Sequence, residues 1–314
     1  MTLRVTFLGT GGAVPTTERN PSAVFVNREG DQLLFDCGEG TQRQMMRYST
    51  GFAVSHIFVT HVHGDHVLGI PGLTQTWDFN DREEPLAVHA PAGTRSVIER
   101  LLSATGESPS YPVRVHQVRP GDVALSREDY EVRAFEVNHR TDAVGYALVE
   151  DDRKGRFDRQ KAEEELGIEP GPKYSKLHRG ESVELDDGRV IEPEQVVGPP
   201  RPGRRVVYTG DTRPTESTVT AAEDADLLVH DATFTDERSG RARETAHATA
   251  REAGEVAARA GTRRLALTHV SSRYAGDVSG HEREAAAGVA DRGGDAEVFV
   301  PDDGDTIEVS YPDD

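Results

Sequence analysis

The chain of 314 residues contains one cysteine and no long apolar run. Because the single thiol, Cys37, cannot close an intrachain disulfide, we expect a protein of the reducing cytoplasm. Cys37 itself is expected to be a small buried hydrophobic residue. No apolar stretch approaches the length of a transmembrane helix, so no membrane is expected as a partner. The opening residues lack the basic and apolar regions of a signal peptide, and we expect none.

Lysine is also scarce. Only four of the 36 basic residues are lysines, the acidic residues number 55, and the formal net charge is −19. A globular chain this acidic, with arginine favoured over lysine, is typical of a salt-loving (halophilic) cell; an ordinary acidic enzyme is the alternative. An acidic surface argues against nucleic acid as a partner. That argument weakens in molar salt, where the screening length is only about 3 Å.

The stretch richest in chemistry is residues 60–66, Thr-His-Val-His-Gly-Asp-His, with three histidines and an aspartate. The apolar, β-branched run before it, residues 54–60, is too short for a helix and predicts a buried strand. The residues from Gly64 to about Asp78 have an apolar spacing that predicts a helix. The cluster is therefore expected on a tight turn between a strand and a helix.

Side-chain directions at such a turn favour metal binding. His61 and His63 alternate off one side of the departing strand, and Asp65 and His66 come round at the start of the helix. One metal ion is expected on the first pair and another on the second pair. Imidazole and carboxylate ligands at this density suit zinc, with manganese or iron as alternatives. Isolated surface histidines, the other interpretation, do not explain four ligand-type side chains so close together.

Three further candidate ligands each follow an apolar strand: His139, Asp211 and His269. Strand ends converge at one edge of a sheet, so these distant positions are expected to meet in one cleft. Asp211 is the natural bridging ligand, because a carboxylate can give one oxygen to each of two metal ions. Such ions lie about 3.5–4 Å apart and bind both the entering and the leaving oxygen of a displacement.

The rest of the sequence predicts a mixed α/β protein. Short strand patterns in both halves alternate with helical ones, including a long helix from about Thr245 to Ala260. Two mixed sheets packed face to face with helices outside, an αββα sandwich, is the economical architecture. We expect residues 1–314 to form a single domain of this kind that carries one insertion.

The H-x-H-x-D-H pattern of residues 61–66 resembles the metallo-β-lactamase superfamily. Other stretches narrow the resemblance to the RNase Z family, the tRNA 3′-processing endonucleases. Among them, the D-C-G-E-G-T-Q run and the T-H-V-S-S-R-Y run are far more specific than the metal motif. The matching stretches span nearly the whole chain and lie at residues 7–11, 19–20, 36–42, 61–66, 208–212, 230–234 and 267–274.

This resemblance implies a fold, a metal content and an activity. The fold is a metallo-β-lactamase sandwich with a protruding arm. The implied ligands of one zinc ion are His61, His63, His139 and Asp211, and those of the second are Asp65, His66, Asp211 and His269. The activity is zinc-dependent cleavage of the 3′ trailer from precursor tRNA, which leaves a 3′-hydroxyl on the tRNA. The family also implies a homodimer.

The chemistry of that cleavage suggests four catalytic residues. Asp65 is the candidate base, because it is a ligand that also accepts a hydrogen bond from the attacking water. The leaving 3′ oxygen needs a proton, and His247, predicted at the start of a helix, is the candidate acid. In the family this histidine pairs with a glutamate; here Asp231, one methylene shorter, stands in that place. Arg273 is expected to hold a phosphate through its planar fork, and a structural ion pair is the alternative. The histidines without a partner pattern are expected to be bystanders: His56, His89, His116, His178 and His281.

Residues 151–180 interrupt the strand pattern and contain every lysine of the chain. They hold eight basic and seven acidic residues, a balance of +1, so the other residues carry −20. A solvated loop is one interpretation, but all the lysines of a lysine-poor chain in one segment indicate phosphate contact. We expect an RNA-binding arm for precursor tRNA, with Lys173, Lys176 and Arg179 as contacts. The RNase Z family carries an arm that grips the tRNA elbow.

Two other functions stay open at this point. A different hydrolase of the superfamily, such as a small-substrate phosphodiesterase or thioesterase, would use the same metals and would not need the basic insertion. A non-catalytic RNA-binding module is the second alternative, and the complete ligand set argues against it.

Overall fold

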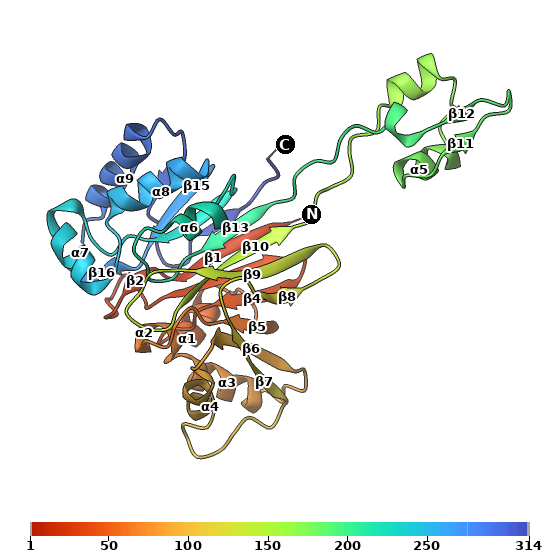
Figure 1. Ribbon diagram of the computed structural model, residues 1–314. Helices are drawn as coiled ribbons and strands as arrows, with labels where there is room; N and C mark the ends of the chain where they lie inside the picture. Colours follow the sequence, from red (N-terminus) through yellow and green to blue (C-terminus); the bar gives the residue numbers. More distant parts are fainter. Residues whose placement is uncertain (1, 275, 313–314) are drawn as a thin grey trace. The chain divides into compact units, whose positions relative to one another are not determined.

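The computed structural model describes residues 2–274 and 276–312. The chain forms two compact units (Figure 1). The first comprises Met1–Val149 and Arg204–Ser310, and the second comprises Glu150–Gly203 together with the chain end from Tyr311.

The first unit is built on two seven-stranded mixed sheets. The strands of the first sheet are, in spatial order, β18 (Thr306–Glu308), β1 (Leu3–Gly9), β3 (Ala23–Arg28), β4 (Asp31–Phe35), β5 (Val54–Phe58), β6 (Leu86–Pro91) and β7 (Val113–Val118). Those of the second are β17 (Glu297–Phe299), β15 (Arg264–Thr268), β14 (Leu227–Asp231), β13 (Arg205–Tyr208), β10 (Val144–Glu150), β9 (Tyr130–Glu136) and β8 (Val123–Ser126). Strands β4 to β7 run parallel, as do β13, β14, β15 and β17. In each sheet, several strands therefore end at the same edge.

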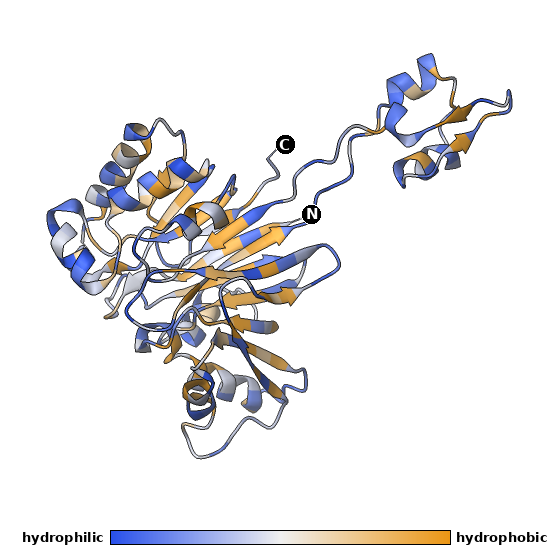
Figure 2. Ribbon diagram, in the orientation of Figure 1, coloured by the Kyte–Doolittle hydropathy of each residue, from blue (hydrophilic) through white to orange (hydrophobic). Residues whose placement is uncertain are grey.

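The central strands of both sheets are buried on both faces. Successive side chains of a strand point to opposite sides, so Leu33 and Phe35 of β4 enter the core between the sheets while Leu34 packs under the outer helices. In β13, Val206 faces the core between the sheets and Val207 faces outward onto helices. This explains the apolar runs in these central strands (Figure 2).

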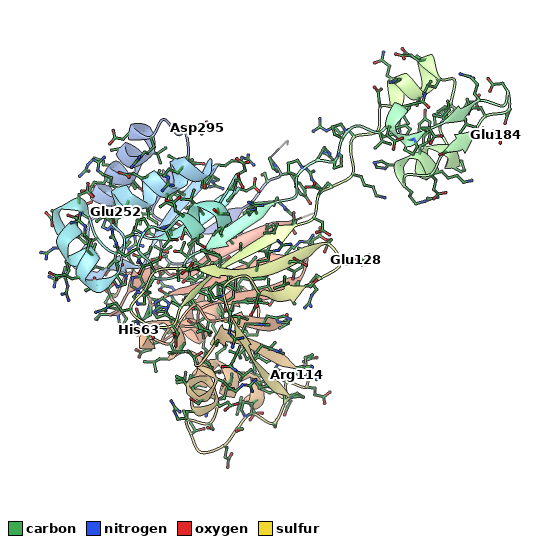
Figure 3. The ribbon with its side chains drawn as sticks, in the orientation of Figure 1. His63, Arg114, Glu128, Glu184, Glu252 and Asp295 are labelled. Carbon is green, nitrogen blue, oxygen red and sulfur yellow. The ribbon has the colours of Figure 1, made fainter. Side chains whose placement is uncertain are left out.

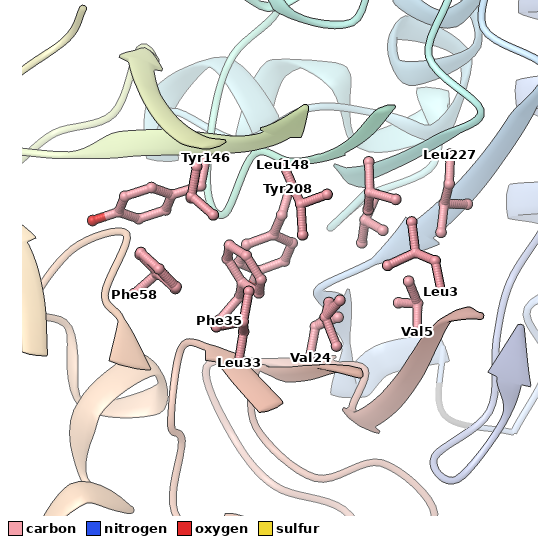
Figure 4. Packing of buried hydrophobic residues seen from close by; sticks show 14 of the residues in the cluster. Leu3, Val5, Val24, Leu33, Phe35, Phe58, Tyr146, Leu148, Tyr208 and Leu227 are labelled. Atoms are coloured by element: carbon pink, nitrogen blue, oxygen red, sulfur yellow. The ribbon is translucent and has the colours of Figure 1, made fainter. Parts of the chain in front are cut away.

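Aromatic rings pack together in part of the core between the sheets, beside leucine and valine side chains (Figure 4). The rings of Phe35 and Phe58 stack with centroids 4.9 Å apart, and Tyr146 meets Phe58 edge to face at 5.3 Å. The hydroxyls of Tyr146 and Tyr208 donate to the carbonyl of Val59 and to a carboxylate oxygen of Asp36, both at 2.9 Å. Each tyrosine thus joins the second sheet to a strand end of the first.

Helices cover the outer faces of both sheets (Figure 1). Those on the first sheet are α1 (Thr41–Arg47), α3 (Ile70–Phe79) and α4 (Arg95–Leu102), and those on the second are α6 (Glu216–Ala221), α8 (Ala250–Ala260) and α9 (Ser279–Asp291). Helices α8 and α9 approach closely because of a glycine: a Cβ atom on Gly254 would lie 2.1 Å from the carbonyl oxygen of Ala285. The predicted αββα sandwich is confirmed. In the chain as described, no helix is both long and apolar enough to cross a membrane.

Two predicted helices are wrong in extent. The helix expected from Gly64 to about Asp78 is two helices, α2 (Gly64–Val67) and α3, which starts at Ile70. A continuous helix would place Pro71 in its interior, where proline removes a hydrogen bond, whereas the first turn of α3 accommodates it.

The helix expected from about Thr245 begins only at Ala250, because another helix ends at Thr245. Helix α7 (Ser239–Thr245) ends there, and Ala246 takes a left-handed φ of 57°. Thr249 then caps α8 in a reciprocal capping box with Glu252. His247 therefore lies in the turn between two helices and not at a helix start.

The second unit has a small core of its own. It contains α5 (Pro172–His178), a π-helical turn at Lys161–Glu165 and a hairpin of β11 (Val183–Glu184) and β12 (Val190–Ile191). Its buried apolar side chains are Ala162, Ile168, Leu177, Val183, Leu185, Ile191 and Val196. The unit thus continues past the expected end at residue 180 to Gly203. Over 150–203 it holds ten basic and fourteen acidic residues, a balance of −4, so its basic character is confined to part of it.

Candidate metal centre

All seven predicted ligands meet where strands of the two sheets end. His61 and His63 follow β5, and Asp65 and His66 lie in the short helix α2. The other three come directly after strands or shortly beyond them: His139 after β9, Asp211 after β13 and His269 after β15. Figure 3 labels His63 within this region.

The first group consists of His61, His63, His139 and Asp211, whose ligand atoms all lie within 4.8 Å of one another. The Oδ2 atom of Asp211 is 3.5 Å from His61 Nε2 and 3.8 Å from His139 Nε2. His63 Nδ1 is 2.9 Å from His61 Nε2 and 3.3 Å from His139 Nε2. Three ring nitrogens and a carboxylate oxygen therefore converge on one point.

The second group consists of Asp65, His66 and His269 around the other oxygen of Asp211. Oδ1 of Asp211 lies 3.2 Å from His66 Nε2 and 3.1 Å from His269 Nε2. Oδ2 of Asp65 lies 3.1 Å from His269 Nε2 and 3.6 Å from His66 Nε2. Asp211 thus presents one carboxylate oxygen to each group, the placement expected of a bridging ligand.

Two observations fit these groups to a divalent cation. His66 Nε2 and Asp211 Oδ1 are buried, and neither has a hydrogen-bond partner of good geometry within residues 2–274 and 276–312. Burial alone would lower the pKa of His66 and His269, but the nearby carboxylates, Asp211 first, raise both, that of His269 to about 9. The carboxylates therefore attract positive charge, which a metal ion supplies. A nitrogen and oxygen donor set without thiolate suits zinc, and also manganese or iron.

Asp36 contacts the ligand His66 on the side of its ring away from the cluster, a role not predicted from the sequence. Its Oδ2 lies 2.7 Å from His66 Nδ1 and accepts hydrogen bonds from the Thr60 and Tyr208 hydroxyls, while Oδ1 accepts from the Thr60 amide. A carboxylate on Nδ1 orients the ring so that Nε2 faces the cluster. Asp36 directly follows the apolar strand β4, the same signal that identified Asp211.

His269 is held in a strained conformation. Its φ of 60° is left-handed, which is unusual for a residue other than glycine. Its Nδ1 lies 2.9 Å from the hydroxyl of Thr233. Gly12 passes so close that a Cβ there would sit 2.5 Å from His269 Nδ1. The parallel ladder of β2 (Gly11–Gly12) with β16 (Val270–Ser271) holds these segments together.

The structure pairs the candidate acid with Asp231. His247 Nδ1 lies 2.8 Å from Asp231 Oδ2, so the shorter side chain does reach. Burial favours the neutral carboxyl, but His247 holds the pKa of Asp231 below its usual value. The His247 ring stacks against the ring of His269 with centroids 5.0 Å apart, and lies 5.3 Å from that of His139. The pair therefore stands directly beside both ligand groups.

The other residues singled out in the sequence of the first unit lie outside the two ligand groups. Arg273 is exposed in the turn Ser272–Tyr274, four residues after His269, and makes no ion pair in the part of the chain that the structure describes. His56 and His89, expected to be bystanders, pair with each other: His56 Nδ1 is 3.0 Å from His89 Nε2. Cys37 is buried, as expected.

The three predicted RNA contacts lie on α5 or just after it. Lys173 Nζ is 3.5 Å from a carboxylate oxygen of Asp186, and Arg179 Nε is 2.8 Å from one of Glu181. Lys176 is exposed. Glu184, labelled in Figure 3, belongs to the hairpin of the same unit.

The two-sheet sandwich with a histidine and aspartate cluster at its strand ends defines a class of metallohydrolases. The model of the metallo-beta-lactamase superfamily matches residues 16–269, and the chain belongs to that superfamily. It is 64% identical over 313 residues to proteins named "Ribonuclease Z" from Halorubrum lacusprofundi and Haloarcula marismortui, covering 100% of this chain and 99% of each relative. The crystal structure of human tRNase Z, short form, aligns with a TM-score of 0.70 and 27% identity, covering 98% of this chain and 100% of that one. Within the superfamily, the chain belongs to the ribonuclease Z family.

Proposed function

We propose that the protein is an endoribonuclease that removes the 3′ trailer from precursor tRNA and leaves a 3′-hydroxyl on the tRNA. The observation that carries the proposal is the junction at Asp211, with one oxygen in each ligand group and the His247–Asp231 pair beside them. The names of the full-length relatives and of the human structural neighbour support it.

The proposed cofactor is a pair of zinc ions. The residues that would hold the first ion are His61, His63, His139 and Asp211, and those that would hold the second are Asp65, His66, Asp211 and His269. Such a pair, when bound, makes water acidic enough to attack near neutral pH and stabilises charge on the phosphate.

Asp65 is the proposed base. Its Oδ2 accepts a hydrogen bond from the Ala13 amide at 2.8 Å and lies 3.1 Å from His269 Nε2, so the carboxylate is oriented from two sides. His269 and His66 hold the pKa of Asp65 below its usual value although burial opposes them. Asp65 is therefore ionised at neutral pH and able to accept the proton of the attacking water.

His247 is the proposed acid. Because Asp231 holds its Nδ1, the Nε2 atom is the one able to give a proton to the leaving 3′ oxygen. Arg273, exposed and four residues after His269, is proposed to hold a phosphate near the cleaved bond.

The second unit is the proposed RNA-binding arm. Lys176 forms no ion pair among the residues that the structure describes, so it is available to a phosphate. Lys173 and Arg179 have partners, but Asp186 and Glu181 are exposed. Exposed ion pairs stabilise little, so a phosphate can replace either acid at small cost.

The decisive experiment is incubation with a precursor tRNA that carries a 3′ trailer, followed by mapping of both new ends. Cleavage at the trailer junction with a 3′-hydroxyl on the tRNA is expected. Replacement of the second unit's residues 151–203 by a short linker separates this function from a small-ester hydrolase, because a small-substrate phosphodiesterase or thioesterase would be indifferent to the loss. Absence of bound metal from the purified protein would favour the non-catalytic RNA-binding module.

We also propose that the protein works as a homodimer in the cytoplasm of a halophilic cell. The family resemblance and the acidic composition support this. Light scattering coupled to size exclusion at molar salt tests the dimer, and a mass of one chain, 34.3 kDa, would contradict it.

A further inference from the structure

We propose that Arg213 is a positioning residue for His247, an inference that rests on the proposed function. The guanidinium of Arg213 donates from Nη1 to the carbonyl oxygen of His247 at 2.6 Å. The same group forms a two-pronged ion pair with Glu252: Nη1 lies 2.7 Å from Oε2, and Nη2 contacts Oε1. One planar cation therefore joins the acid's backbone to the first turn of α8.

His247 needs such a contact because, among the residues that the structure describes, no backbone amide of a helix donates to its carbonyl. The turn that contains it begins at Ala246, in the left-handed conformation, and ends at the cap Thr249. The amide of His247 donates to the carbonyl oxygen of Ala242 at 2.9 Å. Arg213 fixes the other side of the same residue, so the ring keeps its direction toward Asp231. A shift of about 1 Å in a reacting group can cost about 10² in rate.

The backbone of Arg213 is hydrogen-bonded to segments that carry the candidate ligands. It lies two residues after Asp211, and its amide donates to the carbonyl of Asn138 at 2.9 Å. The Asn138 amide in turn donates to the Thr212 hydroxyl at 3.0 Å. Asn138 directly precedes the ligand His139. The main chain of Arg213 is therefore hydrogen-bonded into the two segments that carry Asp211 and His139.

The partner of Arg213 is equally fixed. Glu252, labelled in Figure 3, accepts the amide of Thr249 at 2.9 Å in the capping box of α8. The guanidinium thus lies between the capped start of α8 and the carbonyl of the acid. A planar fork suits this better than lysine, since it can donate to three acceptors in fixed directions.

A purely stabilising ion pair is the competing explanation, and the neighbouring residue supplies a matched control. Arg251, also in the first turn of α8, contacts the carboxylates of Asp236 and Asp291, both at 2.6 Å. No contact joins Arg251 to His247 in the described ranges. Arg251→Gln therefore removes a comparable ion pair from the same helix and leaves the acid alone.

The test is a double-mutant cycle on cleavage of a precursor tRNA with a 3′ trailer, with the protein loaded with metal. Arg213→Gln is expected to lower kcat by about 10²-fold with little change in KM. In a His247→Ala background the same change should cost less than about threefold, since contacting groups couple. Arg213→Lys should recover part of the rate, and Arg251→Gln should stay within about twofold of the parent. Additive losses in the two backgrounds, or equal losses for Arg213→Gln and Arg251→Gln, would overturn the proposal.

A second substrate separates positioning of the acid from general damage. The leaving group of bis(p-nitrophenyl) phosphate needs no proton, so the loss caused by Arg213→Gln should be at least about tenfold smaller there than on tRNA. Equal losses on both substrates would overturn the proposal.

Should Arg213→Gln fail to fold, Glu252→Gln serves instead, because its amide oxygen can still accept the Thr249 amide while the guanidinium loses its anchor. It should show a smaller loss that also disappears in the His247→Ala background, and a loss that persists there would count against the proposal. A parent protein that does not cleave tRNA overturns the proposed function itself. A parent that cleaves while His247→Ala is unimpaired overturns only the roles of His247 and Arg213.

Discussion

The Nδ1 atom of His247 lies 2.8 Å from Oδ2 of Asp231, whose carboxylate is buried. The Thr212 amide donates to the same oxygen, and the amide and hydroxyl of Thr233 donate to the other. The turn of His247 reaches the end of β14 because the amide of Ala250 donates to the carbonyl of Phe234. Local backbone pairing thus holds the turn within reach of the aspartate, whose side chain is one methylene shorter than that of glutamate.

Lengthening that side chain should therefore gain nothing. Asp231→Glu adds a methylene to a buried site in which four donors already surround the carboxylate, and overpacking of this kind costs about 1–3 kcal/mol. We expect lower thermal stability and no rise in kcat. Melting temperature and tRNA cleavage are measured together, and a faster enzyme would show that Asp231 is not well placed.

Removing the acid should slow the chemistry without disturbing the cluster. His247→Ala is expected to keep metal and RNA binding and to lower turnover by about 10²–10⁴, the usual contribution of general acid catalysis. Metal content by atomic emission and tRNA affinity are measured beside kcat. Activity equal to that of the parent would make His247 a bystander.

Removing the shared carboxylate should empty the site. Asp211→Ala is expected to lose metal and abolish cleavage, since Asp211 is the residue with an oxygen in both ligand groups. Metal per chain is counted after dialysis. Retention of two ions would contradict the bridging assignment.

The arm should bind tRNA without touching the cleaved bond. Replacing Lys173, Lys176 and Arg179 together by Gln is expected to weaken tRNA binding much more than turnover of a small activated diester. The salt dependence of binding should also flatten, by about 0.9 in log–log slope for each duplex phosphate that the variant no longer neutralises.

The control for the arm is a charge-matched triple of exposed arginines in the first unit, Arg100, Arg114 and Arg119, which should leave tRNA affinity unchanged. Both sets are compared across a salt series in which the protein stays folded, because self-repulsion destabilises so acidic a chain at low salt. If tRNA binding and diester turnover fall together, the arm is structural. If neither falls, these bases are solvated charges.

A histidine stack away from the cluster should make folding sensitive to acid. Burial lowers the pKa of His89 to about 3 and that of His56 to about 4. His89 stacks on Phe58 at 4.7 Å and on His116 at 5.1 Å, and Arg127 lies 3.0 Å from His56 Nε2. In the unfolded chain these histidines bind protons near pH 6.5, whereas in the folded chain they do so only near pH 3–4. The free energy of unfolding is therefore highest above pH 6.5 and declines as the pH falls from there toward the pKa values of the folded state.

His89→Gln should abolish the uptake of up to one proton on unfolding. The slope of the unfolding free energy against pH should therefore fall by up to about 1.4 kcal/mol per pH unit. Denaturant unfolding at fixed salt, from pH 6.5 to 4.5, measures the slope for parent and variant. The variant should be less stable at pH 7 but lose stability less steeply. Parallel slopes would show that His89 does not titrate with unfolding.

Short-range pattern alone determined much of this protein. The strand–turn–helix arrangement of His61 to His66, the ligands that follow apolar strands and the two-sheet sandwich can be predicted, because alternation and strand ends dictate where neighbouring side chains point.

What the tertiary structure decided depends on contacts between residues far apart in the chain. Asp36 orients His66 across 30 positions, and Arg213 reaches His247 across 34. The turn that carries His247 exists because Ala246 and Thr249 end one helix and cap the next. The second unit runs to Gly203 because Ile191 and Val196 pack with Leu177 in the unit's core. Periodicity reports which face of an element is buried, but not which distant side chain will cover it.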